Sequence, residues 1–145
     1  MKTVKCIVLV LTIIAFASFT HAKGLKNDKQ TKDLATRATN LFGEEKIKEG
    51  FLLLKPHWPM PEAEIENLIN QTEMQWSVVE KRFGKSISVE FVREERIAES
   101  FIKYLFMQKF ENHAIRWEIM FYKPRDIWKM NMVKWDDKIH LLFSD

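Results

Sequence analysis

The stretch "HAIRWEIMFYKPRDIWKM", residues 113–130, decides the fold, because apolar and polar side chains alternate through both of its halves. A period of two is typical of a β-strand that buries one face, and the proline in "KPRD" favours a turn between the halves. The stretch therefore predicts a hairpin of two antiparallel strands. Its many rings could line a binding pocket, or they could only fill a core.

The same alternation, followed outward from this hairpin, predicts a sheet of four strands. These are "ISVEFV" (87–92), "FIKYLFMQKF" (101–110), "AIRWEIMFY" (114–122) and "IWKMNMVKW" (127–135). The turns between them are short and polar or contain proline, so strands that are neighbours in sequence are expected to pair in an antiparallel sheet.

Helical spacing of apolar residues precedes the strands. One pattern runs to Gly43 and a second ends before "KPHWPMP" (55–61), so we expect two segments bent at Gly43. A third begins at Pro61 and ends at Gly84, with one apolar stripe along it. Helices followed by a meander predict an α+β domain, in which N-terminal helices and one long amphipathic helix pack across a four-stranded curved antiparallel sheet.

Turns at 112–113 and 124–125 would fix the register of this sheet. The expected facing residues are Phe121 with Trp128 and Tyr104, Ile119 with Met130 and Phe106, and Trp117 with Met132 and Gln108. All of them lie on the side that receives the long helix, so the rings are expected to be core residues. A cavity left between helix and sheet would be lined by Trp76, Tyr104, Phe106, Gln108, Trp117, Ile119, Phe121 and Trp128.

The opposite side of the sheet mixes apolar and charged side chains. Its apolar members predict the interface of a weak homodimer, formed by Leu105, Met107, Met120 and Tyr122. Glu118 shares this side with Lys109 and Lys129, and we expect it to form a solvated surface ion pair.

The N-terminus predicts export, because Lys2 and Lys5 precede an apolar run that starts at Cys6 and is too short to span a bilayer. We expect cleavage of a signal peptide (1–22) after Ala22, with Ala17 as the alternative, and a periplasmic or secreted protein without a stable membrane anchor. Removing 1–22 takes away two lysines and no acidic residue, which lowers the net charge from +3 to +1. A nearly neutral chain does not favour nucleic-acid binding. A flexible segment (23–30) is expected to precede a single domain (31–145).

A family resemblance covers about residues 50–143. The motifs "GFLLLKPHWPMP", "RFG", "RW", "FYKPRDIW" and "WDD" resemble those of small exported bacterial proteins of the cystatin-like or nuclear transport factor 2-like superfamily. The resemblance implies a helix lying across a curved antiparallel sheet. It implies no single reaction, because the superfamily includes ketosteroid-isomerase-like enzymes, dehydratases and many non-catalytic binding domains.

The residues that could carry chemistry are few. His57, His113 and His140 lack the spacing of metal ligands on a helix, and the glycines form no phosphate loop, so we expect neither a metal nor a cofactor. Asp136 and Asp137 could approach the mouth of a cavity from the end of the fourth strand.

The predicted inner side offers only Tyr104 and Gln108 as polar groups, and neither is a general base. The sequence therefore favours a non-catalytic extracytoplasmic binding or interaction domain, whose ligand is an unknown protein or an apolar small molecule. The alternative is a small isomerase- or dehydratase-like enzyme acting on an apolar small molecule.

Overall fold

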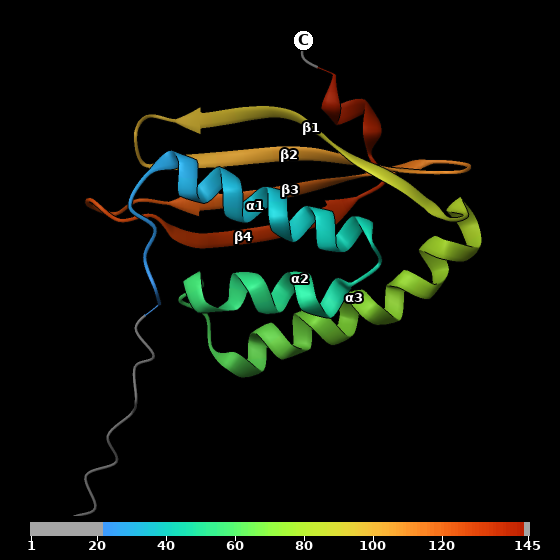
Figure 1. The fold of residues 1–145 in the computed structure, drawn as a ribbon, viewed down its shortest axis with the longest axis horizontal. Coiled ribbons are helices and arrows are strands. Elements are labelled where there is room, and N and C mark those ends of the chain that lie inside the picture. The colour runs from blue at the N-terminus through green and yellow to red at the C-terminus, as the bar shows by residue number, and fades with distance from the viewer. Residues whose placement is uncertain (1–21, 144–145) are drawn as a thin grey trace, which may run out of the picture.

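A computed structural model describes residues 22–143. Three helices, α1 (Asp28–Gly43), α2 (Ile47–Leu54) and α3 (Glu62–Phe83), come first, with a short turn η1 (Lys55–His57) between α2 and α3. Four strands follow, β1 (Ser86–Ile97), β2 (Phe101–Phe110), β3 (Ala114–Tyr122) and β4 (Lys129–Asp136), and then a C-terminal turn η2 (Ile139–Leu142). The strands form one antiparallel sheet in the order β1-β2-β3-β4 (Figure 1). The predicted α+β architecture is confirmed.

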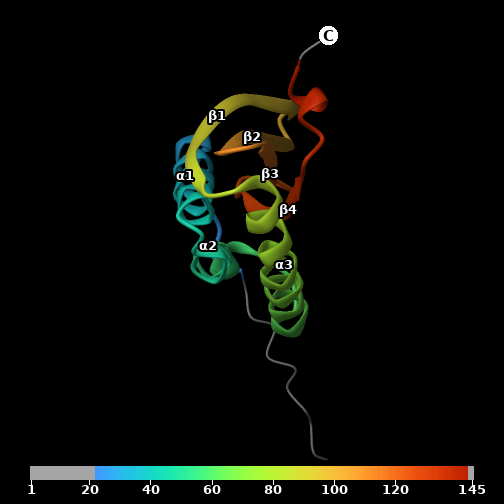
Figure 2. The same cartoon turned by 90° about the vertical axis from the view of Figure 1, so that its right-hand side faces the viewer.

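The helices cover one face of the sheet, which we call the inner face. Helix α1 lies along β1, β2 and β3, and α2 packs beside α1 (Figure 1). Helix α3 joins this layer through a single buried stripe that includes Trp76 and Phe83, and it ends at Gly84, whose φ of 80° suits glycine. The turn η2 lies on the opposite, outer face (Figure 2).

The register of the β2–β3 hairpin differs from the predicted one by two residues. Tyr104 pairs with Ile119 and Phe106 pairs with Trp117, because the turn is centred between Glu111 and Asn112 and not between Asn112 and His113. A shift by two preserves which face each side chain occupies. The predicted inner and outer sets of β2 and β3 therefore hold, although their facing partners do not.

The β3–β4 pairing corrects the prediction further, because a register shift interrupts it between Met120 and Phe121. Phe121 pairs with Met130, but Met120 already pairs with Met132. The extra residue of such a bulge turns the following side chains to the other face. Met132, predicted to face Trp117, therefore pairs with Met120 on the outer side.

In the second half of β4, the residues on the inner face are not the predicted ones. Val133 pairs with Ile119 and Trp135 pairs with Trp117, and both are packed against the buried core. Trp117 thus faces the ring of Trp135 on the neighbouring strand. The inner apolar face of β4 therefore extends to Trp135, one residue before the strand ends.

The segment 23–30 corrects the expectation of a flexible N-terminus. Leu25 is buried and exchanges two backbone hydrogen bonds of 2.9 Å with Trp128, and the Lys23 N–H donates to the Pro56 carbonyl at 2.7 Å. Asn27 caps α1 by accepting from the Gln30 N–H, so the helix starts at Asp28. Except for Ala22, the predicted signal peptide lies outside the described residues. None of the helices within 22–143 is long and apolar enough to cross a membrane.

Candidate functional site

The residues predicted to line a cavity instead fill the space between helices and sheet. All eight of them are buried, and their rings are in contact: Trp117 stacks on Phe42 with centroids 4.2 Å apart, and Trp76 lies 5.9 Å from Trp117. The interpretation of the rings as core residues is confirmed. The inner face supplies packing.

With one exception, the polar side-chain atoms of this core form hydrogen bonds within the protein. Gln108 accepts from the Trp117 indole N–H at 2.9 Å and donates to Ser86 Oγ at 2.8 Å. Tyr104 and Thr31 share a hydrogen bond of 2.7 Å between their hydroxyl groups, and burial raises the pKa of Tyr104 to about 12. Among the buried side-chain nitrogen and oxygen atoms of residues 22–143, only Trp76 Nε1 has no hydrogen-bond partner. Neither polar residue of the inner face is therefore free to serve a substrate.

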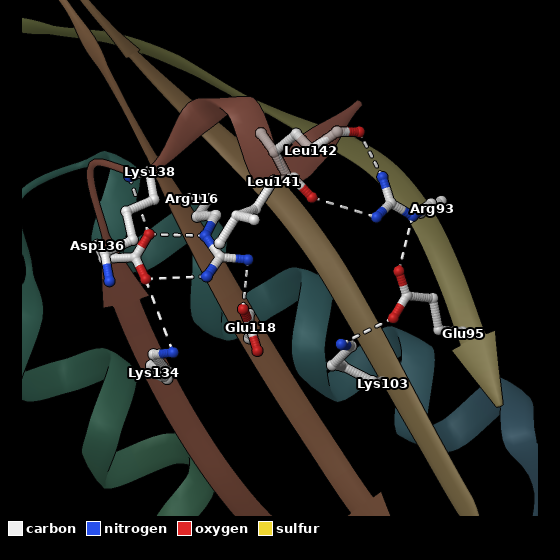
Figure 3. Close-up of polar contacts among 10 residues, drawn as sticks. All are labelled: Arg93, Glu95, Lys103, Arg116, Glu118, Lys134, Asp136, Lys138, Leu141 and Leu142. Atoms are coloured by element: carbon white, nitrogen blue, oxygen red, sulfur yellow. Dashed lines mark hydrogen bonds and ion pairs between the residues drawn. The ribbon is translucent and has the colours of Figure 1, made fainter. Parts of the chain in front are cut away.

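The outer face contains an ion network that the sequence did not predict. Arg116 donates to both carboxylate oxygens of Asp136, at 2.6 and 2.9 Å, and to Glu118 at 2.5 Å (Figure 3). Lys134 lies 3.7 Å from Asp136 and brings the group toward neutrality. Three of the four side chains are largely withdrawn from water, so this is a buried network.

Glu118 is where the sequence prediction fails most clearly. It is only 8% exposed and pairs with Arg116, whereas the predicted partner Lys109 binds Glu90 and Lys129 lies at the far end of β4. The cause is the chain that follows β4, which returns over this part of the sheet. A solvated surface ion pair is therefore replaced by a buried one.

The returning segment is held by Arg93 of β1. The Arg93 guanidinium donates to the carbonyl oxygens of Leu141 and Leu142, and its Nε donates to Glu95 at 2.8 Å (Figure 3). Residues 138–143, which we call the C-terminal strap, thus lie over β3, the strand that carries Arg116 and Glu118. Leu105, on this face and outside the main core, is 1% exposed.

That burial changes the predicted homodimer interface. Leu105 is not accessible to a partner, while Met107 and Met120 are half-buried and Tyr122 is exposed. The four residues therefore do not form one open apolar patch, because Leu105 is buried.

A groove of about 390 Å³ opens where the end of α3 meets the end of β4. Val79, Phe83 and Trp135 provide apolar lining; the other lining residues are Gln75, Val78, Arg82, Asp136 and Asp137. Both aspartates of "WDD" therefore do reach the mouth of a concave site. The site lies at the sheet edge rather than between α1 and the sheet.

The two aspartates differ in their electrostatics. The hydrogen bonds from Arg116 hold the pKa of Asp136 below its usual range, which keeps this carboxylate ionised and makes it a weak base. Asp137 is exposed and forms no ion pair within 22–143, and the same holds for Arg82 on the α3 wall. The groove thus has an apolar floor and one unpaired charge of each sign on its rims.

Sequence reasoning missed the α3 wall of this groove, namely Gln75, Val78 and Arg82. The available signal was the apolar pair Met74 and Val78, which lies off the buried stripe of the helix. An apolar residue outside the core-facing stripe has no packing role within the domain, so such a pair can indicate a contact with another molecule.

No group of three or more His, Cys, Asp or Glu side chains in residues 22–143 is placed to hold a metal ion. His57 Nδ1 forms a hydrogen bond with the Lys23 carbonyl, and His113 packs edge-on against Phe83. Comparisons with protein-family models, with curated proteins and with solved structures find no match to this chain.

Proposed function

We propose that this chain is a non-catalytic, extracytoplasmic binding domain that uses the groove between α3 and β4. The observation that carries the proposal is the combination of an apolar floor with unpaired charges on the rims. A few convergent polar groups around an apolar concavity are the usual composition of a binding site. The cystatin-like or nuclear transport factor 2-like resemblance is compatible with this role, since that superfamily includes binding domains.

The filled inner face supports binding over the isomerase- or dehydratase-like alternative. Such an enzyme needs a general base within reach of its substrate and a donor for the developing oxyanion. Tyr104 and Gln108 are committed to Thr31, Ser86 and Trp117, and Asp136 at the groove is committed to Arg116. A carboxylate with a lowered pKa suits ion pairing better than proton abstraction.

Export is part of the proposal. Fixed backbone contacts begin at Lys23, so cleavage after Ala22 would leave the anchored chain whole, whereas cleavage after Ala17 would leave residues 18–22 ahead of it. Intact-mass measurement on protein from the extracytoplasmic fraction should therefore find a chain that begins at Lys23. Full-length protein as the main species in the cytoplasm would contradict export.

The groove can be tested by site-specific photocrosslinking in the exporting cell. A benzoylphenylalanine in place of Val78, which is 55% exposed at the groove, is expected to give a discrete adduct that mass spectrometry identifies. The control is the same photoreactive residue in place of Ile87, which is 63% exposed at the start of β1. Equal labelling from both positions, or none from position 78, would contradict a binding role for the groove.

A further inference from the structure

The α3 wall of the groove is also a ridge. Met74 and Val78 are 77% and 55% exposed, and residues four apart project from the same side of a helix. The ridge is apolar, and the groove beside it has an apolar floor that includes Val79 and Phe83. A convex and a concave apolar element therefore lie side by side on one surface.

The charges on this surface are also of two kinds. Arg82, near the end of α3, and Asp137, after β4, stand on opposite walls of the groove, are exposed, and have no ion-pair partner in the part of the chain described. The neighbouring Asp136 is already neutralised by Arg116 and Lys134. The surface thus presents one free cation and one free anion across a short apolar floor.

From this shape and charge pattern we infer that the occupant of the groove is a second copy of the chain, related by a two-fold axis; the inference rests on the proposed binding role of the groove. A two-fold axis brings the same patch to both sides of an interface, so the patch must be complementary to itself. Here the Met74–Val78 ridge of one copy enters the groove of the other. Arg82 of each copy then faces Asp137 of the partner subunit.

This arrangement replaces the homodimer predicted from the sequence, which used Leu105 on the outer face. It explains why two large apolar side chains stay exposed on α3 although the inner face is complete without them. It also gives each free rim charge a partner, which a wholly apolar ligand would not.

Reversal of one charge at a time tests the pairing. Arg82→Asp alone would place two carboxylates against each other at both contacts of the homodimer, and Asp137→Arg alone would place two guanidinium groups there. Each change should raise the homodimer dissociation constant at least about tenfold, because like charges then oppose each other twice. In an equimolar mixture of the two variants, both contacts of the heterodimer join a carboxylate to a guanidinium, so mixing should restore an affinity close to the parental one, and a mixture that associates no better than the single variants would overturn the pairing.

The double variant Arg82→Asp with Asp137→Arg supplies the rescue. It exchanges the two charges within one chain, so each contact of its homodimer again joins a carboxylate to a guanidinium. Its dissociation constant should return to within about threefold of the parental value, which a merely structural role of either residue would not produce.

Sedimentation velocity of the processed chain over a concentration series measures these constants. Lys81→Asp and Asp126→Arg are the matched controls, since they make charge reversals of the same sign at exposed positions outside the groove, and their homodimers should dissociate like the parent. Circular dichroism melts establish that all the variants are folded.

A parent that stays monomeric at every concentration overturns the inference, and so do single variants that dimerise as well as the parent. Failure of the binding role itself looks different. A crosslink from position 78 to some other molecule would keep the proposed function and overturn the second copy, whereas absence of any specific crosslink would overturn both.

Discussion

The two faces of the sheet are both buried around β3, but they are buried by different means. On the inner face, helices cover rings whose few polar atoms, except Trp76 Nε1, are paired within the protein. On the outer face, the short C-terminal strap covers Arg116 and Glu118, whose burial depends on charge pairing. Apolar burial stabilises without a specific partner, while a buried ion is tolerated only while its partner stays in place. The inner face should therefore respond to loss of volume and the outer face to loss of charge.

Truncation of the central ring should give the largest effect. Trp117→Ala removes a fully buried indole between Phe42, Trp76 and Trp135, and is expected to lower the free energy of unfolding by about 3 to 5 kcal/mol. Urea unfolding of parent and variant measures the difference. A variant that unfolds like the parent would mean that the inner face is not the core.

Loss of the network's cation should come next. Arg116→Met keeps much of the side-chain volume but leaves Asp136 and Glu118 without their shared partner, and should cost about 2 to 3 kcal/mol. We place this below the cost for fully buried pairs because Asp136 is reached by water and by Lys134. The control is Lys134→Met, which removes an exposed cation of the same network and should change stability by no more than about 0.5 kcal/mol. Equal losses from both variants would argue against a special role for Arg116.

The pH dependence of stability should separate the two faces. Arg116 lowers the pKa of Asp136, so its contribution is present above the unfolded value of about 3.9 and is lost as pH falls through the lower folded value. Burial raises the pKa of Tyr104 to about 12, so its contribution is present below the unfolded value of about 10 and is lost as pH rises toward 12. Acid thus weakens the outer face and alkali weakens the inner face.

Two single variants measure this separation. Asp136→Asn should flatten only the acid limb of the stability curve, and Tyr104→Phe only the alkaline limb, in urea unfolding series from about pH 3 to 5 and from about pH 9 to 12. A Tyr104→Phe protein that is as sensitive to alkali as the parent would show that another group controls that limb.

The difference between the faces also explains what the sequence could predict. The period of two assigns each residue of β2 and β3 to a face, and the predicted sets survive the change of register because the shift was even. The bulge at Met120 and the loop before β4 depend on local backbone geometry that periodicity does not encode, so Met132 was assigned to the wrong face.

The site was less accessible to sequence reasoning than the fold. Glu118 was predicted to be solvated because the C-terminal strap that buries it follows about 20 residues later in the sequence. No local sequence pattern indicates that the chain folds back over β3. The groove forms only where the ends of α3 and β4 come together in the tertiary structure, which local sequence patterns do not show. Only "WDD" and the off-stripe pair Met74 and Val78 pointed to it.

The smallest expected effect concerns the hold of the strap on the outer face. Arg93→Gln removes the guanidinium that binds the Leu141 and Leu142 carbonyl groups, a contact near the surface, so global stability should fall by only about 0.5 to 1 kcal/mol. The local effect should be larger, because segments with few buried contacts open independently of the core. The Leu141 N–H, bonded to the Lys138 carbonyl at 3.0 Å, should then exchange with deuterium faster than in the parent.

Mass-spectrometric exchange over 137–143 reports that opening, and a segment of β3 that includes Trp117 serves as an internal reference that should not change. Arg125→Gln, an exposed arginine in the loop before β4, is the matched control and should leave the strap's exchange at the parental rate. Faster exchange of the strap alone would show that the strap opens independently of the core. The outer face would then be covered by a segment that can detach, unlike the inner face, which the helices cover. Faster exchange in β3 as well would show that strap and core unfold as one unit, and the two modes of burial would then not be independent.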